Sequence, residues 1–145
     1  TGVAESVGGG NFLILAKSQP QALAACEVAI EAMRKVENVI MPFPGGVVRS
    51  GSKVGSKYKA LNASTNDAFC PTLKGQTKTQ LSHEIESVME IVIDGLSADD
   101  IRTAMRIGIE AACALGSDHG IQRISAGNYG GKLGPFLFPL HEVLA

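Results

Sequence analysis

The alternation of apolar and polar positions divides the chain into two β-α-β units, which an irregular stretch separates. In the first unit, residues 11–17 form a continuous apolar run that is long enough for a strand and too short for an ordinary helix. Ser18 is the expected N-cap of a helix that ends near residue 37, because apolar side chains recur there every three or four positions. Residues 39–43 predict a brief second strand, and the prolines around Phe43 put its end at a sheet edge.

The second unit opens with residues 87–96, the most strand-like segment of the sequence, which carries Glu90 at its centre. Since residues two apart share a face of a strand, Glu90 lies between Val88 and Val92, and its immediate apolar neighbours point the other way. Both faces are therefore largely apolar, which predicts a strand that is covered on both sides or central in a sheet. A carboxylate in this position loses its water, and its pKa rises toward a neutral, proton-donating form.

Ser97 and Asp100 form a capping-box-like start for a second helix, which a glycine ends, and residues 121–125 predict a last strand. The complete order predicts an α+β fold, a ferredoxin-like βαββαβ sandwich in which the first and third strands are central and both helices cover one face. Residues 45–86 are then a long insertion between the second and third strands. Glu90 is expected on a central strand.

The length and composition are those of one domain, because 145 residues, 45% of them hydrophobic, suffice to bury a core. Residues 1–10 are small and flexible like an inter-domain linker. The chain also starts at Thr1 rather than at Met, which suggests a piece of a longer protein. The folded domain is expected over residues 11–145.

A net charge of −1 provides no basic field for nucleic acid or for an anionic membrane. The apolar stretches are shorter than the roughly 20 residues that span a membrane. Three cysteines without a Cys-x-x-Cys pair fit neither a disulfide framework nor a cysteine zinc site. We expect Cys26 and Cys113 to be small core residues and Cys70, before a proline, to be the more accessible thiol. The three histidines lack the spacing of metal ligands, so we expect no metal site. These features predict a soluble, cytoplasmic protein that binds neither nucleic acid nor a membrane.

A local excess of positive charge lies in the insertion, where residues 49–59 contain four cations and no acidic residue occurs from 38 to 66. Backbone N–H groups of the glycines, serine hydroxyls and lysine charges would together bind carboxylates or phosphates. A solvated basic loop explains the composition equally well. Residues 46–53 are not a nucleotide-binding P-loop, because the lysine follows the serine and no helix pattern comes after it.

A second glycine-rich segment covers residues 127–135, after the last strand. It does not have the Gly-x-Gly-x-x-Gly spacing of a dinucleotide fingerprint, and it does not open a helix. Two interpretations stay open, a tight structural turn and a close approach of the backbone to a ligand.

Glu90 also has two interpretations. In the structural one, the buried carboxylate pairs with a lysine or an arginine. In the functional one, a protonated glutamic acid in a dry site donates a hydrogen bond to an oxygen on which negative charge develops, as an oxyanion hole does.

Four glycine-punctuated segments, in this order, resemble the C-terminal half of formylmethanofuran:tetrahydromethanopterin formyltransferase. They are residues 9–15, 42–59, 87–96 and 126–134, so the resemblance spans nearly the whole chain. It implies a two-lobed protein in which each lobe is a ferredoxin-like unit. This chain would be the C-terminal (distal) lobe, and residues 1–10 would be the linker from a missing N-terminal lobe.

The resemblance implies transfer of a formyl group between methanofuran and N5 of tetrahydromethanopterin in one-carbon metabolism. Both coenzymes are then substrates, and no metal or prosthetic group is permanently bound. The implied partners are the N-terminal lobe and either further copies in a homo-oligomer or a formyltransferase/hydrolase complex. A non-catalytic coenzyme-binding or assembly module is the alternative when the chain is separated from the N-terminal lobe.

The resemblance also implies the catalytic residue, since the context Glu-Ile-Val-Ile-Asp-Gly-Leu puts the family's catalytic glutamate at Glu90. Methanofuran and the pterin tail carry acidic groups, from which we infer that both glycine-rich loops contact the coenzymes. The expected substrate-binding residues are Arg49, Ser50, Ser52, Lys53, Ser56, Lys57, Asn128, Tyr129 and Gly130. Residues 74–84 have no counterpart in the resemblance and receive no site.

Overall fold

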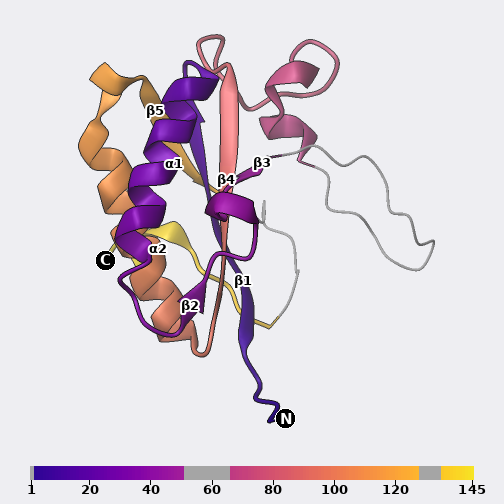
Figure 1. Cartoon of the computed structure of the whole chain (residues 1–145). Coiled ribbons are helices and arrows are strands. Elements are labelled where there is room, and N and C mark those ends of the chain that lie inside the picture. The colour runs from indigo at the N-terminus through magenta and orange to yellow at the C-terminus, as the bar shows by residue number, and fades with distance from the viewer. Residues whose placement is uncertain (1, 51–65, 128–134) are drawn as a thin grey trace, which may run out of the picture.

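The computed structural model describes residues 2–50, 66–127 and 135–145 of the chain (Figure 1). The helices and strands in these ranges are β1 Val7–Ala16, α1 Gln19–Met33, β2 Val39–Ile40, β3 Val48–Arg49, β4 Ser87–Gly95, α2 Ala98–Leu115, β5 Ile121–Ala126 and α3 Leu140–Val143. Within the described ranges, no helix is both long and apolar enough to cross a membrane.

The described strands form a single antiparallel sheet in the order β2-β4-β1-β5, and β3 also pairs with β4. Both β1 and β4 therefore have a neighbour on each side. The long helices α1 and α2 pack together on one face of the sheet (Figure 1). The prediction that Glu90 lies on a central strand is confirmed, because β4 pairs with β1 on one side and with β2 and β3 on the other.

β1 begins at Val7, earlier than the boundary at Asn11 that the apolar pattern predicts. Residues 7–10, which we expected in a linker, are thus part of the strand. The register with β4 shifts within this segment, where Gly9 has a φ of +96° and its N–H donates to Asp94 Oδ1 at 3.1 Å. Glycines add no apolar period to a sequence, so this β-bulge left no pattern to detect.

The second strand, expected over residues 39–43, is two short strands instead of one. β2 pairs with the end of β4 at Gly95, and β3 pairs with its middle at Glu90. Between the two, Pro44–Gly46 form a 3-10 turn. The pairing stops after Ile40 and resumes only after the turn, and Pro42, which has no N–H to donate to a ladder, does not extend it.

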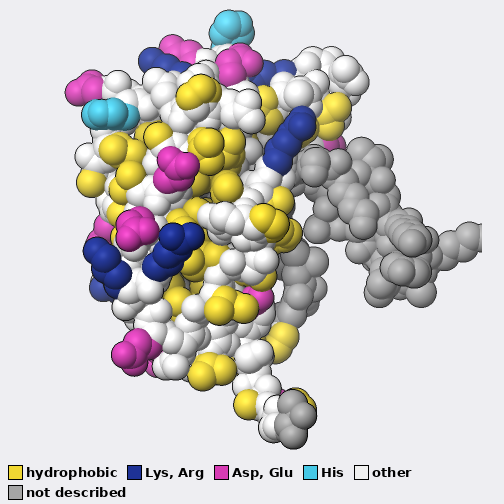
Figure 2. Space-filling view, viewed as in Figure 1, with side chains coloured by type: hydrophobic (Ala, Val, Ile, Leu, Met, Phe, Trp, Pro, Cys, Tyr) yellow, Lys and Arg dark blue, Asp and Glu magenta, His cyan; other side chains and the backbone are white. Residues whose placement is uncertain are grey.

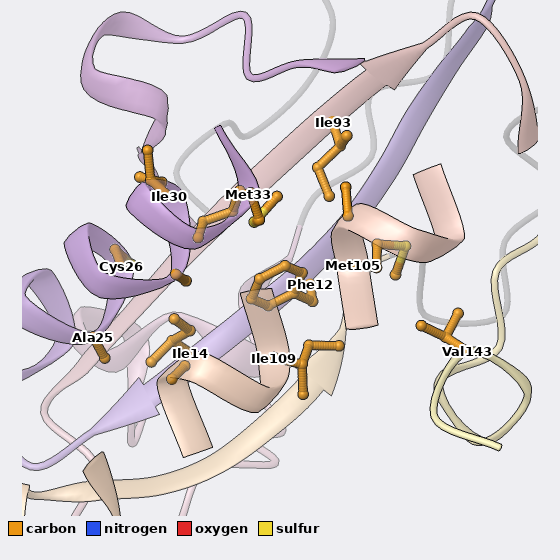
Figure 3. Packing of buried hydrophobic residues seen from close by; sticks show 14 of the residues in the cluster. Phe12, Ile14, Ala25, Cys26, Ile30, Met33, Ile93, Met105, Ile109 and Val143 are labelled. Atoms are coloured by element: carbon orange, nitrogen blue, oxygen red, sulfur yellow. The ribbon is translucent and has the colours of Figure 1, made fainter. Parts of the chain in front are cut away.

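The main core lies between the sheet and the two long helices (Figure 3). The ring of Phe12 points from β1 between α1 and α2, where Met33 and Met105 lie on either side of it. Gly108 of α2 lets the helices approach one another, because a Cβ at this position would overlap the side chain of Met33. The side chains of Phe12, Met33 and Met105 are fully buried.

A smaller cluster covers one end of the opposite face of the sheet. Its buried members come from β1, β4 and the segment before β4, and they are Leu13, Leu15, Phe69, Leu81, Ile85 and Val88. Glu90 is not among them and is half-buried. The sheet thus has one face covered by helices and a second face on which Glu90 lies beside an apolar cluster.

Candidate functional site

Glu90 lies in the middle of β4, on the face of the sheet that points away from the helices. Its neighbours across the sheet are Leu13 on β1 and Val48 on β3. The predicted alternation is confirmed, because Val88 belongs to the cluster on this face and Ile91 belongs to the core under the helices. The period of the strand therefore places a carboxyl group among apolar neighbours.

Burial raises the pKa of the Glu90 carboxyl above its ordinary value, as the sequence predicts. Asn11 has the opposite and smaller effect, since its Nδ2 donates a 2.7 Å hydrogen bond to Glu90 Oε1 and so favours the charged form. No lysine or arginine of the described residues forms an ion pair with Glu90. The geometry in this part of the chain therefore favours the interpretation as an acid over the structural ion pair.

Asn11 reaches Glu90 from β1, close to the place where β5 ends. Its position in the register is opposite Val92, so Asn11 and Glu90 are diagonal neighbours on one face. Gly127 follows β5 directly, and a Cβ at this residue would overlap the side-chain amide of Asn11. Three strands thus bring together a carboxyl group, an amide and a glycine.

Asn11 was not among the candidate residues of the sequence analysis, and Gly127 was included only as part of the glycine-rich segment 127–135. The sequence did offer one indication of Asn11, a polar residue at the start of an apolar run. It lies two positions before Leu13, so the two side chains share a face of the strand. Its contact with Glu90 spans 79 positions of sequence and depends on the register between β1 and β4. A single sequence does not contain that register, so the pair could not be found from the pattern.

Two of the expected substrate-binding residues are described, and neither contacts Glu90. Arg49 is exposed and lies opposite Met89, so its side chain leaves the sheet on the helix-covered face. There it borders a groove of about 470 Å³ with Leu23 of α1. Ser50 is buried, and its hydroxyl oxygen accepts a 2.6 Å hydrogen bond from the amide of Asn66. Contacts of these two residues with a coenzyme stay predictions.

The other expected substrate-binding residues lie outside the described residues, and their roles also stay predictions. They are Ser52, Lys53, Ser56, Lys57, Asn128, Tyr129 and Gly130.

The segment 74–84, to which the sequence assigned no site, is tied to the start of β4. Lys74 Nζ lies 3.3 Å from Glu86 Oε1 and donates a 3.0 Å hydrogen bond to the carbonyl oxygen of His83. Among the described histidine, cysteine, aspartate and glutamate residues, no group of three could hold a metal ion.

The cysteines differ from expectation in their burial. Cys70, expected to be the more accessible thiol, is buried, and Cys113, expected in the core, is exposed near the end of α2. Cys26 is buried as expected, and burial raises the pKa of its thiol to about 12. A thiol with this pKa carries almost no thiolate at neutral pH, which makes Cys26 a small core residue.

The face of the molecule in Figure 2 carries acidic and basic side chains interspersed, without a continuous basic field. This distribution agrees with the net charge of −1. A net charge this close to zero gives the chain no strong overall potential.

The fold and the site define a mixed α/β protein whose five-stranded antiparallel sheet carries a half-buried carboxyl group with a raised pKa on its open face. A family model described as "FTR, proximal lobe" matches residues 1–143. The chain therefore belongs to the family of formylmethanofuran–tetrahydromethanopterin formyltransferases, of which this model describes one lobe.

A curated formylmethanofuran–tetrahydromethanopterin formyltransferase of Methylococcus capsulatus is 81% identical over the whole chain, which covers 49% of that relative. The formyltransferase structure from Methanosarcina barkeri matches with a TM-score of 0.83 and 47% identity, over 95% of this chain and 46% of the other. The formyltransferase/hydrolase complex of Methylorubrum extorquens, solved with methylofuran, matches with a TM-score of 0.85 and 45% identity, over 99% of this chain and 46% of the other. The chain spans about half the length of the curated relatives it matches.

The expected assignment to the distal lobe is wrong, because the matching family model describes the proximal lobe. The resemblance implied the same order of strands and helices in both lobes. The order of elements therefore could not distinguish one lobe from the other, and the family itself was recognised from the four sequence segments.

Proposed function

We propose that the chain is part of an enzyme that transfers a formyl group between methanofuran and N5 of tetrahydromethanopterin. The identity of 81% with a relative of that name supports this activity. The observation that carries the proposal within the chain is Glu90, a half-buried carboxyl group with a raised pKa and no cation paired with it among the described residues.

The chemistry of formyl transfer gives this acid its role. An amine of one coenzyme attacks the formyl carbon, the π electrons of the carbonyl move to oxygen, and a tetrahedral intermediate with a negatively charged oxygen forms. The carbonyl then re-forms as the C–N bond to the other coenzyme breaks, and the proton that the attacking nitrogen loses ends on the nitrogen that leaves. A neutral Glu90 would donate a hydrogen bond to that oxygen and would stabilise it more than the uncharged carbonyl of the substrate. This proposed step forms no bond between the coenzyme and the protein, and it uses no permanently bound cofactor.

The proposal extends to the coenzyme-binding loops and to the wider assembly. Arg49, Lys53 and Lys57 would bind acidic groups of the coenzymes, which the absence of acidic residues from 38 to 66 supports. Residues 128–130 would approach a coenzyme with their backbone. The partner would be the other lobe, within a homo-oligomer or a formyltransferase/hydrolase complex in the cytoplasm, and residues 1–10 would include the connection to that lobe.

We also propose that the architecture is the ferredoxin-like βαββαβ sandwich. The strand order β2-β4-β1-β5 supports this assignment, with β2 and β3 together as the second strand. Both long helices lie on one face, as that arrangement requires (Figure 1).

The direct test is a formyl-transfer assay of the intact protein with formylmethanofuran and tetrahydromethanopterin. N5-formyl product that depends on both coenzymes is the expected result. Absence of the product, with both coenzymes bound, would contradict the proposed activity.

The second candidate function is a non-catalytic binding module. It is favoured by the finding that the chain spans about half the length of its curated relatives. The 145-residue chain and the intact protein are compared in the same assay, with cooperative thermal unfolding as the control for folding of the shorter chain. Coenzyme binding by the folded chain without turnover would identify it as such a module.

A further inference from the structure

The contact between Asn11 and Glu90 involves one oxygen of the carboxyl group. Asn11 Nδ2 donates to Glu90 Oε1 at 2.7 Å, and no other described side chain has a hydrogen bond to either carboxyl oxygen. The short distance makes this a strong restraint, because the amide and the carboxyl group project from adjacent strands with fixed register. The other carboxyl oxygen, Oε2, has no such restraint from the described residues.

This asymmetry decides where an acidic proton is most stable. In a carboxylic acid, the carbonyl oxygen is the better acceptor and the hydroxyl oxygen carries the proton. An amide N–H that donates to Oε1 therefore makes Oε1 the carbonyl oxygen. The proton is then favoured on Oε2, from which it can be donated.

Gly127 controls the space that the Asn11 amide occupies. Phe12 pairs with Ala126 in the register of β1 and β5, so Gly127 passes beside Asn11. A Cβ at Gly127 would overlap the amide group of Asn11, and a larger side chain would displace it further. The glycine backbone on one side and the Glu90 carboxyl on the other hold the amide in place.

Other charged groups near the site have separate partners. Asp94, on the same face of β4, accepts from the N–H of Gly9 at 3.1 Å. On β5, Arg123 lies over the ring of Phe69 and donates to the carbonyl oxygen of Gln80. On β3, the register turns Arg49 toward the helix-covered face. None of these described groups replaces the contact that Asn11 makes.

We propose that Asn11 is a positioning residue for formyl transfer: its amide orients the Glu90 carboxyl and directs the acidic proton to Oε2, and glycine at position 127 keeps the space for that amide. This inference rests on the proposed function. Glu90 keeps its proton throughout and acts by hydrogen bonding alone. The raised pKa of Glu90 agrees with a carboxyl group that is protonated when it acts.

The test replaces Asn11 by Leu, which has a similar shape and no donor, and by Ala, in the intact protein. The kcat should fall roughly ten- to a hundredfold, as expected for a misplaced reacting group, and KM should change by less than about threefold. The basic limb of the pH profile should move to higher pH, because the lost N–H favours the charged form of Glu90. Gln122→Leu removes an exposed amide from β5 and is the control with unchanged kcat.

A double-mutant cycle tests Gly127. Gly127→Ala should lower kcat to a similar degree by displacing the amide, whereas adding it to Asn11→Ala should cause little further loss, because no amide remains to be displaced. Additive losses from the two substitutions would contradict a role of Gly127 through Asn11.

An infrared titration of the Glu90 carboxyl separates failure of this inference from failure of the proposed function, with Glu90→Gln identifying the band. If the protein needs Glu90 for transfer but Asn11→Leu changes neither kcat nor the carboxyl pKa, the positioning role is overturned and the proposed function remains intact. If the protein forms no N5-formyl product but Asn11→Leu raises the carboxyl pKa, the proposed function is contradicted. The orientation of Glu90 by Asn11 is then still supported.

Discussion

Burial of Glu90 links the site to the pH dependence of folding. Its pKa is raised mainly by desolvation, so the folded chain holds this proton more tightly than the unfolded chain does. Below the unfolded pKa, both states are protonated and the group causes no pH dependence. As the pH rises through the range between the unfolded and folded pKa values, the unfolded state gains from ionisation and the folded state loses relative stability.

Glu90→Gln should remove this pH dependence. The free energy of unfolding of the variant, minus that of the wild type, should therefore increase from pH 4 to pH 8, because only the wild type loses stability as the carboxyl ionises. Urea unfolding at several pH values measures the difference. Glu110→Gln, on the exposed side of α2, reports the general effect of removing one charge. A difference that is constant or falls as pH rises would contradict the raised pKa.

At the scale of single residues, the sequence predicted the carboxyl group and missed its partner. The alternation around Glu90 was sufficient to predict burial and a raised pKa, since both follow from neighbours along the strand. The contact with Asn11 and the proximity of Gly127 depend on strand register, and the burial of Cys70 depends on long-range packing. These properties are set by pairings between distant segments.

At the scale of elements, the sequence predicted the starts of the two long helices from the polar side chains that precede them. Ser97 begins α2 as expected, since its Oγ accepts from the N–H of Asp100 at 3.1 Å. Ser18 occupies the N-cap position of α1, but its hydroxyl donates to Gln21 Oε1 instead of accepting from the helix backbone. Helix α1 also ends at Met33, earlier than the apolar stripe predicted.

The two serines provide a matched test of helix capping. Ser97→Ala should lower the free energy of unfolding by about 1 kcal/mol, because a backbone N–H loses its acceptor. Ser18→Ala should cost less, since its side chain makes no such bond. Chemical denaturation of both variants measures the difference, and equal losses would show that capping does not determine the effect.

At the scale of the whole molecule, the order of strands and helices was predictable because each has a distinct hydrophobic period. The division of the second strand into β2 and β3 was not, because strands of two residues are too short to show a period. The glycine-rich start of β1 was not, because glycines add no apolar positions. The family was recognisable from long segments of sequence, but the choice of lobe was wrong. Of the predicted coenzyme-binding residues, those at positions 52–57 and 128–130 lie outside the described chain.

The basic loop makes a separate prediction for coenzyme binding in the intact protein. Replacing both Lys53 and Lys57 by Gln should raise KM for a coenzyme about tenfold or more and change kcat little, because charge-assisted hydrogen bonds to its acidic groups are lost before the chemical step. Lys78→Gln is the control, an exposed lysine outside the loop. An unchanged KM for both coenzymes would favour the solvated-loop interpretation.

The central claim is that Glu90 donates a hydrogen bond in the transfer reaction. Turnover of Glu90→Gln in the intact protein tests it most directly, with steady-state formyl transfer measured alongside thermal unfolding and with Glu110→Gln as the charge control. The account predicts a folded protein whose kcat is roughly a hundredfold or more lower, the scale of losing an oxyanion-hole donor. A folded Glu90→Gln protein with the kcat of the wild type would contradict it.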